Sequence, residues 1–214
     1  MPVVTISRQF GAGGSSVAAL VAAELGADVV DKRLIEEVAR RLEMPPDEVE
    51  AEDEHPRGLL ARLLRSFSTL EPGMGAGWAP PFPDPLFDPR KAVIELTEQV
   101  IREVAAAGNA VIVGRGAGFV LHDKPDVFRV FLRAPLPHRT GVIVERLKVG
   151  EAEARRKILE TDANRQAYIH QLYKRDWCDP DEYDLVINTG RLSFQTAADL
   201  ILRGIADLTP AQTA

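Results

Sequence analysis

A glycine-rich turn close to the N-terminus has the residue types that bind phosphate groups. The stretch "FGAGGSS" follows an apolar, β-branched run at residues 2–7 and precedes an alanine-rich run at residues 15–25. A turn from a strand into a helix directs several backbone N–H groups into one concavity, and the N-terminus of the helix adds partial positive charge. We therefore expect nucleotide phosphates to be held by Gly11, Ala12, Gly13, Gly14, Ser15 and Ser16. A tight turn without a ligand is the alternative interpretation.

The lysine of the usual phosphate-binding loop is absent from this turn. That pattern ends in glycine, lysine and serine or threonine, and Gly13, Gly14 and Ser15 take these three places here. The Ser15 hydroxyl remains able to meet Mg²⁺. Arg8, six residues before Gly14, is the candidate catalytic replacement, because its guanidinium could curl back over the loop. In the alternative, Arg8 pairs with a nearby carboxylate, and the loop binds phosphate through its backbone and the helix dipole alone.

Further arginines occur where a second ligand contact is expected. "VIVGRGAG" is another apolar run that ends in a glycine turn, with Arg115 at its tip. Open α/β sheets bind ligands at the carboxyl ends of their parallel strands, so Arg115 is a candidate catalytic and binding residue. Asp162 and Arg165 are three positions apart on one face of a predicted helix. They form either an intrahelical ion pair or part of a site that closes over phosphate.

The elements that must position these residues alternate between strand and helix. Apolar runs predict strands at residues 2–7, 27–31, 109–116, 127–135 and 181–189. Helical periodicity predicts helices at residues 15–25, 33–42, 91–107, 137–147, 151–173 and 193–208. Such alternation is typical of an α/β fold whose parallel sheet is covered on both faces. The proline- and glycine-rich stretch 66–89, with its interspersed aromatic residues, is predicted to be the most irregular part of the chain, and a loop of this length is usually functional or disordered.

Composition and charge limit the possible classes of protein. The 214 residues suffice for one large domain with a buried core, and the longest apolar runs are too short to span a bilayer. A formal charge of −6 argues against long nucleic acid as a partner, whereas local arginine clusters suit a small polyanion. The single cysteine and the lack of a signal segment before the first strand favour a cytoplasmic location. The oligomeric state stays open.

Together, these motifs resemble the cytidylate kinase-like family of the P-loop nucleoside monophosphate kinase superfamily. "ISRQFGAGG", "DKR", "VGRG" and "DW…YDLVINT" carry the resemblance, and "VFLRAPLPHR" and "TDANR" fit further motifs of the superfamily. The resemblance implies a single domain over residues 1–214 with a three-layer P-loop fold and a parallel central sheet. It also implies an inserted acceptor-binding lobe at 44–90 and a lid helix region at 151–177. The sequence departs from the superfamily pattern at Gly14, Val113, Gly116, Ile158 and Thr161.

The resemblance implies a kinase that uses ATP and Mg²⁺ and transfers the γ-phosphate to a nucleoside monophosphate, with CMP or dCMP the favoured acceptor. The residues it implies at the acceptor are Asp31, Lys32, Arg33, Arg115 and Arg139. Those it implies around the donor are Arg155, Arg156 and Arg165, with Asp162 orienting them. Two alternatives remain at this point: a non-catalytic nucleotide-binding protein with the same fold, and a kinase of another small metabolite.

Overall fold

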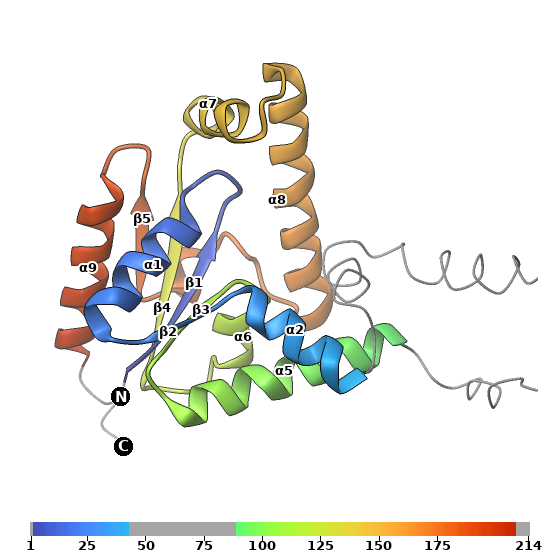
Figure 1. Cartoon of the computed structure of the whole chain (residues 1–214), viewed down its shortest axis with the longest axis vertical. Coiled ribbons are helices and arrows are strands. Elements are labelled where there is room, and N and C mark those ends of the chain that lie inside the picture. The colour runs from blue at the N-terminus through green and yellow to red at the C-terminus, as the bar shows by residue number, and fades with distance from the viewer. Residues whose placement is uncertain (1, 43–88, 209–214) are drawn as a thin grey trace, which may run out of the picture.

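A central sheet of five parallel strands forms the middle of the molecule (Figure 1). The computed structural model describes residues 2–42 and 89–208. The strands are β1 (Val3–Arg8), β2 (Asp28–Val30), β3 (Ala110–Val113), β4 (Val127–Arg133) and β5 (Leu185–Asn188). Their order is β2-β3-β1-β4-β5, and all four neighbouring pairs are parallel. The predicted α/β class is confirmed, and the carboxyl ends of the strands share one edge of the sheet.

Helices cover both faces of this sheet and make three layers (Figure 1). One face carries α1 (Gly14–Leu25) and α9 (Phe194–Asp207). The other carries α2 (Lys32–Leu42), α5 (Pro89–Ala107) and the short α6 (Ala117–Val120). Beyond the carboxyl ends of the strands, α7 (Leu136–Leu147) packs against α8 (Glu151–Tyr173). None of the described helices has the length and apolar character that a membrane span needs.

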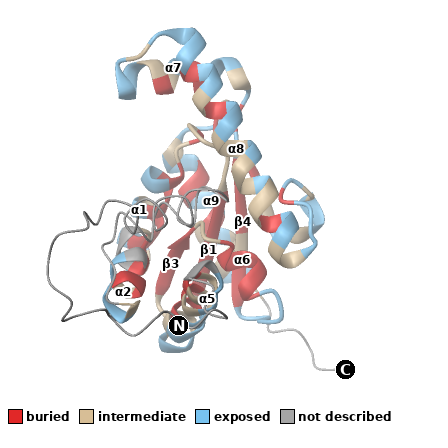
Figure 2. Ribbon diagram, turned by 90° about the vertical axis from the view of Figure 1, so that its right-hand side faces the viewer, coloured by how far each residue is buried: buried red, intermediate tan, exposed pale blue. Residues whose placement is uncertain are grey.

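The strands are apolar on both faces because both faces are buried. On β1, Val4 and Ile6 join the cluster beneath α1 and α9, whereas Val3 joins the cluster beneath α2 and α5. This alternation follows from the two-residue period of a strand, and burial on both faces is typical of parallel sheets. Figure 2 shows the buried residues concentrated in the sheet and on the helix surfaces that face it, whereas α7 is largely exposed.

The predicted strands and helices are confirmed; β1 has the predicted length, and the other four strands are shorter than predicted. The run at 109–116, for example, contributes β3 only as far as Val113, because the following residues turn away in left-handed conformations. Two short elements were not predicted, namely α6 and a 3₁₀ turn at Pro180–Glu182. The expected acceptor lobe at 44–90 and the irregular stretch 66–89, with Trp78, Phe82 and Phe87, lie outside the described residues apart from positions 89 and 90.

Candidate active site

The loop between β1 and α1 has the geometry of an anion site. Gly11 and Gly13 adopt left-handed conformations, with φ values of +85° and +79°, which glycine reaches without steric cost. The Val17 N–H group donates to the Gly13 carbonyl (3.0 Å). The preceding N–H groups of α1 therefore have no acceptor within the helix and point out of its N-terminus. Two contacts hold the loop from behind: the Thr189 hydroxyl donates to the Ala12 carbonyl (2.9 Å), and the Phe194 ring lies against Gly13.

Two oxygen ligands lie together beside this loop. The Ser15 hydroxyl donates to a carboxylate oxygen of Asp31, Oδ2, at 3.5 Å. The other oxygen of Asp31 lies 4.0 Å from Nη2 of Arg8. Asp31 follows β2, and these two contacts place it beside the glycine loop and the end of β1. The side chains of Lys32 and Arg33, at the start of α2, lie outside the described part of the structure.

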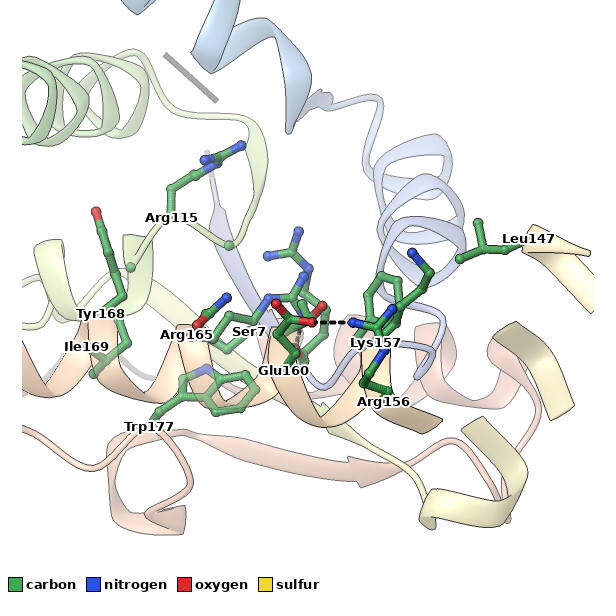
Figure 3. Close-up of a pocket in the computed structure, with 16 residues that line it drawn as sticks. Ser7, Arg115, Leu147, Arg156, Lys157, Glu160, Arg165, Tyr168, Ile169 and Trp177 are labelled. Carbon is green, nitrogen blue, oxygen red and sulfur yellow. Dashed lines mark hydrogen bonds and ion pairs between the residues drawn. The ribbon is translucent and has the colours of Figure 1, made fainter. Parts of the chain in front are cut away.

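A second turn follows β3 and carries Arg115. Gly114, Arg115 and Gly116 are all left-handed, with φ values of +79°, +56° and +70°. For the arginine this conformation costs about 1 kcal/mol or more, and such cost is found most often at functional sites. The Gly114 N–H group donates to the Ile6 carbonyl (3.1 Å), which joins the turn to β1. Arg115 lines the groove beside α8, and in Figure 3 it lies across this groove from the helix, with its side chain extending away from α8.

A groove of about 530 Å³ runs along α8 from the end of β1 to the Arg115 turn (Figure 3). Arg8 and Phe10, which precede the glycine loop, line it, whereas residues 11–16 are not among its described lining residues. Five basic side chains line it, from β1, the β3–α6 turn and α8: Arg8, Arg115, Arg156, Lys157 and Arg165. Glu160 is the one carboxylate among the described lining residues, and it lies 3.3 Å from Nη1 of Arg156. The surplus of positive charge suits phosphate groups.

One face of α8 lines the groove with a row of polar side chains, called the α8 stripe below. Thr161, Asn164, Arg165 and Tyr168 all line the groove, because positions three and four apart share one face of a helix. Burial raises the pKa of the Tyr168 phenol above its ordinary value, although the nearby Arg115 opposes this shift. Tyr168 is therefore uncharged at neutral pH and adds an aromatic surface beside the arginines.

Arg139 and Asp162 do not face the groove, and this revises their expected contacts. Arg139 is 5% exposed. It donates to the carbonyls of Ala134 (2.9 Å) and Phe10 (3.0 Å) and pairs with Asp162 at 2.5 Å. Asp162 in turn accepts from the N–H group of Phe10 (2.8 Å). The buried pair thus binds both backbone groups of Phe10, and neither residue is among the described residues that line the groove.

The remaining arginines of the helix α8 differ from one another. Arg165 donates to the Arg8 carbonyl (2.8 Å) and lies 5.9 Å from the centroid of the Phe10 ring. Arg156 lines the groove, whereas Arg155 is exposed and is not among the described lining residues. Arg8, Arg115, Arg156 and Arg165 are therefore brought together, as the sequence predicts, and Arg155 is not.

Several lining residues were missed by the sequence analysis. Trp177 and Ile169 are buried next to Phe131 and Phe119 at the floor of the groove, and nothing in their spacing distinguishes them from ordinary core residues. The α8 stripe could have been found, because Thr161, Asn164 and Tyr168 stand at helical spacing around Arg165. Gln9, whose side-chain carbonyl accepts from the Ala134 N–H group (3.1 Å), carries no signal in the sequence.

The parallel sheet, the glycine loop and the groove beneath α8 together define a P-loop kinase fold. Solved structures agree with this class. A crystal structure from Eubacterium ventriosum superimposes with a TM-score of 0.69 at 22% identity, covering 97% of this chain and 99% of that one. A sugar kinase from a Janibacter species gives a TM-score of 0.51 at 18% identity, covering 99% and 97%. At these identities the comparison speaks for the fold alone.

Residues 3–191 match the model of the cytidylate kinase-like family, and the chain belongs to this family. The cytidylate kinase of Ignicoccus hospitalis is 28% identical over 208 residues, which cover 95% of this chain and 98% of that protein. The cytidylate kinase of Methanopyrus kandleri is 35% identical over 100 residues, 43% of this chain and 52% of that protein. For several such relatives the match spans little more than half of the relative's length.

Proposed function

We propose that this chain transfers the γ-phosphate of ATP to a nucleoside monophosphate, with CMP or dCMP the favoured acceptor. The observation that carries the proposal is the groove along α8, which extends from Arg8 and Phe10, just before the glycine loop, to the Arg115 turn and is lined by five basic side chains. Phosphoryl transfer asks a protein mainly to align two phosphorylated substrates and to neutralise the charge between them. Membership of the cytidylate kinase-like family supports the same reaction.

The donor phosphates would be held by the glycine loop from Gly11 to Ser16. The N–H groups at the N-terminus of α1 would donate to the β-phosphate, whereas that of Ala12 donates to the Gln9 carbonyl (3.1 Å). Ser15 and Asp31 offer two hard oxygen atoms 3.5 Å apart, a donor set that fits Mg²⁺. Bound there, Mg²⁺ would neutralise part of the phosphate charge. Arg156 and Arg165 would approach the γ-phosphate from α8, since both line the groove.

The acceptor phosphate would be bound by Arg115. Its guanidinium is planar and matches two phosphate oxygens at once, and Arg115 lines the groove on the side opposite α8 (Figure 3). Asp31, Lys32 and Arg33 remain proposed acceptor contacts at the start of α2. Arg139 is better assigned to the loop than to the acceptor, because its donors are taken up by Ala134, Phe10 and Asp162.

Two other functions compete with this proposal. A non-catalytic nucleotide-binding protein is favoured by Gly14, since the position that supplies a lysine in the usual pattern has no side chain. A kinase of another small metabolite would share the whole donor site. It would differ in residues that recognise the acceptor, which the sequence assigns to 44–90.

The test is an assay of ADP formation with ATP, Mg²⁺ and a panel of acceptors: CMP, dCMP, UMP, AMP and GMP. We expect turnover with CMP or dCMP above the ATP hydrolysis measured without acceptor. Binding of ATP without turnover on any monophosphate would support the non-catalytic protein instead. The Arg115→Ala variant serves as a control, because turnover that depends on the proposed site must fall when this residue is changed.

A further inference from the structure

The Arg8 side chain extends from the glycine loop, which follows β1, to the Arg115 turn, which follows the neighbouring strand β3. It leaves the carboxyl end of β1 and passes directly over Gly14, where an added Cβ atom would lie 2.6 Å from Cγ of Arg8 and 3.2 Å from its Cβ. The guanidinium then rests on Gly114, where an added Cβ atom would overlap Nη1 and lie 2.8 Å from Cζ. Two glycines thus border one arginine along its whole length.

This path explains why the expected lysine is absent. A lysine at position 14 would start its side chain in the volume that the Arg8 stem occupies, so the two residues exclude each other. Gly14 has no positive φ value, so the backbone at this position does not itself require glycine. The structure therefore links Gly14 to Arg8 rather than to the shape of the loop.

The backbone of Arg8 is held by contacts with β4 and with α8. Its place in β1 is opposite Leu132 of β4, and its carbonyl accepts a hydrogen bond of 2.8 Å from Arg165 of α8. The side chain is 20% exposed, and Nη2 lies 4.0 Å from Asp31, at the outer limit of an ion pair. The guanidinium thus lies near Asp31 and on Gly114 of the Arg115 turn. Arg8 is also one of the residues that line the groove.

We propose that Arg8 contacts the phosphoryl group in transfer between the two turns, and that Gly14 is a glycine because it leaves room for the Arg8 stem. This role rests on the proposed kinase function. Gly114 leaves room for the guanidinium as well, although its φ value of +79° already favours glycine there. A guanidinium has five N–H donors in a plane and can bind two phosphates at once, whereas an ammonium group is a point charge. From the sequence alone, Arg8 is predicted to curl back over the glycine loop. In the structure its side chain extends further, to Gly114 of the Arg115 turn.

The experiment compares the wild-type chain with Arg8→Met, Gly14→Ala and the double variant. Binding of ATP–Mg²⁺ and of inorganic tripolyphosphate is measured by calorimetry, with melting temperatures as a check on folding. Arg8→Met should weaken both ligands about 10- to 100-fold. Gly14→Ala removes no charge, yet it should weaken them by a similar factor, because its methyl group displaces the arginine stem. In the Arg8→Met background, Gly14→Ala should cause a much smaller further loss.

Two matched controls separate this effect from unspecific ones. Gly141→Ala is also a glycine-to-alanine change in a helix, but its Cβ atom would meet nothing within 4 Å, so binding should be unchanged. Arg203→Met removes an exposed arginine on α9 that pairs with Asp207, and it should also leave binding unchanged. Restoration of tripolyphosphate binding by Gly14→Lys in an Arg8→Ala chain would further support the exchange of one cation for the other.

Normal binding by Arg8→Met and by Gly14→Ala would overturn the role of Arg8 and leave the proposed kinase function intact. Failure of the wild-type chain to bind ATP or tripolyphosphate would overturn the proposed function and this role together. The two failures are distinguishable, because the first is measured in the variants and the second in the wild type. Equal losses caused by Gly14→Ala with and without Arg8 would also contradict the proposal, since the two residues would then act independently.

Discussion

Arg115 and Arg165 reach the groove from different elements, and their surroundings suggest different ligands. Arg115 stands in a left-handed turn after β3, at the carboxyl edge of the sheet where α/β proteins bind ligands. Arg165 extends from α8 and donates to the Arg8 carbonyl next to the glycine loop. The first arginine is thus placed by the sheet and the second by the lid-like helix, which agrees with an acceptor contact and a donor contact.

We expect Arg115→Ala to weaken CMP binding by about 1.5–3 kcal/mol with little effect on ATP, because a charge-assisted hydrogen bond is lost. Arg165→Ala should weaken ATP or lower turnover and leave CMP binding nearly unchanged. Calorimetric titration of each variant with each nucleotide measures both effects. If the two variants weaken both nucleotides equally, the division between acceptor and donor arginines is wrong.

At the scale of elements, one ion pair joins α7 and α8 to Phe10, the residue that precedes the glycine loop. Arg139 of α7 and Asp162 of α8 bind the carbonyl and the N–H group of Phe10 between them. The Phe10 ring packs beside Ile143 and Ile158, with the Arg146 guanidinium 4.9 Å from its centroid. Residues more than a hundred positions away in the sequence thus hold the backbone at the start of the loop. The contact between α8 and this backbone does not require a bound nucleotide.

Arg139→Met should lower the free energy of unfolding, by up to about 3–5 kcal/mol, because it leaves the Asp162 carboxylate, only 16% exposed, without its partner. Urea unfolding measures this loss. Adding Asp162→Asn should recover part of it, since the uncompensated charge is then removed while the amide oxygen can still accept from Phe10. Arg203→Met is the control: its ion pair with Asp207 is exposed, and its loss should cost no more than about 1 kcal/mol. An effect of Arg139→Met no larger than this control would show that the pair does not hold the loop.

The helices α2 and α5 are joined by a surface network whose strength depends on pH. Arg41 pairs with Glu37 of its own helix and with Glu103 of α5, at 2.6 and 2.7 Å. Hydrogen bonds from Arg40 and Arg41 lower the pKa of Glu37 from 4.5 to about 2. A carboxylate whose pKa is lowered by folding stabilises the folded state above its unfolded pKa, and this contribution is lost as the pH falls through the folded value.

Glu37→Gln should therefore lower stability by a constant amount above pH 4.5, and the difference from the wild type should shrink as the pH falls toward about 2. Urea unfolding of both chains over this pH range measures the difference. The direction is opposite to that expected for a group whose pKa is raised by folding. A difference that stays the same down to pH 2 would mean that the Arg40 and Arg41 contacts do not hold Glu37 in its charged form.

At the scale of the whole molecule, the sheet and its helices could be predicted because their signals are local. Apolar runs and glycine stops mark β1, α1 and β3 in the sequence, and the structure confirms each of them. The short α6 could not be predicted in this way. Four residues give no helical period, and α6 begins only because Gly116 adopts a left-handed conformation.

The site was predictable where a motif sits on one element, and not where two distant elements meet. The glycine loop and Arg115 each follow a strand that the sequence marks. By contrast, Arg139 and Asp162 are 23 positions apart, and their burial depends on how α7 and α8 pack over Phe10. The path of Arg8 likewise depends on Gly114, more than a hundred positions away. Contacts of this kind arise from tertiary packing and leave no local pattern.

The proposed function divides the chain into a part that binds the phosphate donor and an acceptor lobe at 44–90. The described residues already form two buried clusters on the sheet, and Leu34 and Val38 of α2 and Val93 and Ile101 of α5 belong to the same one. The helices on either side of residues 43–88, α2 and α5, pack directly against one another on the sheet.

We therefore expect a chain in which residues 43–88 are replaced by a flexible Gly/Ser linker to fold and to retain ATP binding within about threefold, less than 1 kcal/mol. It should lose measurable CMP binding and all phosphoryl transfer to CMP, because the residues that recognise the acceptor base are expected in the removed segment. Thermal unfolding, calorimetry with each nucleotide and the ADP assay measure these three properties. Retained turnover on CMP would show that acceptor recognition lies instead among Asp31, Arg115 and the α8 stripe.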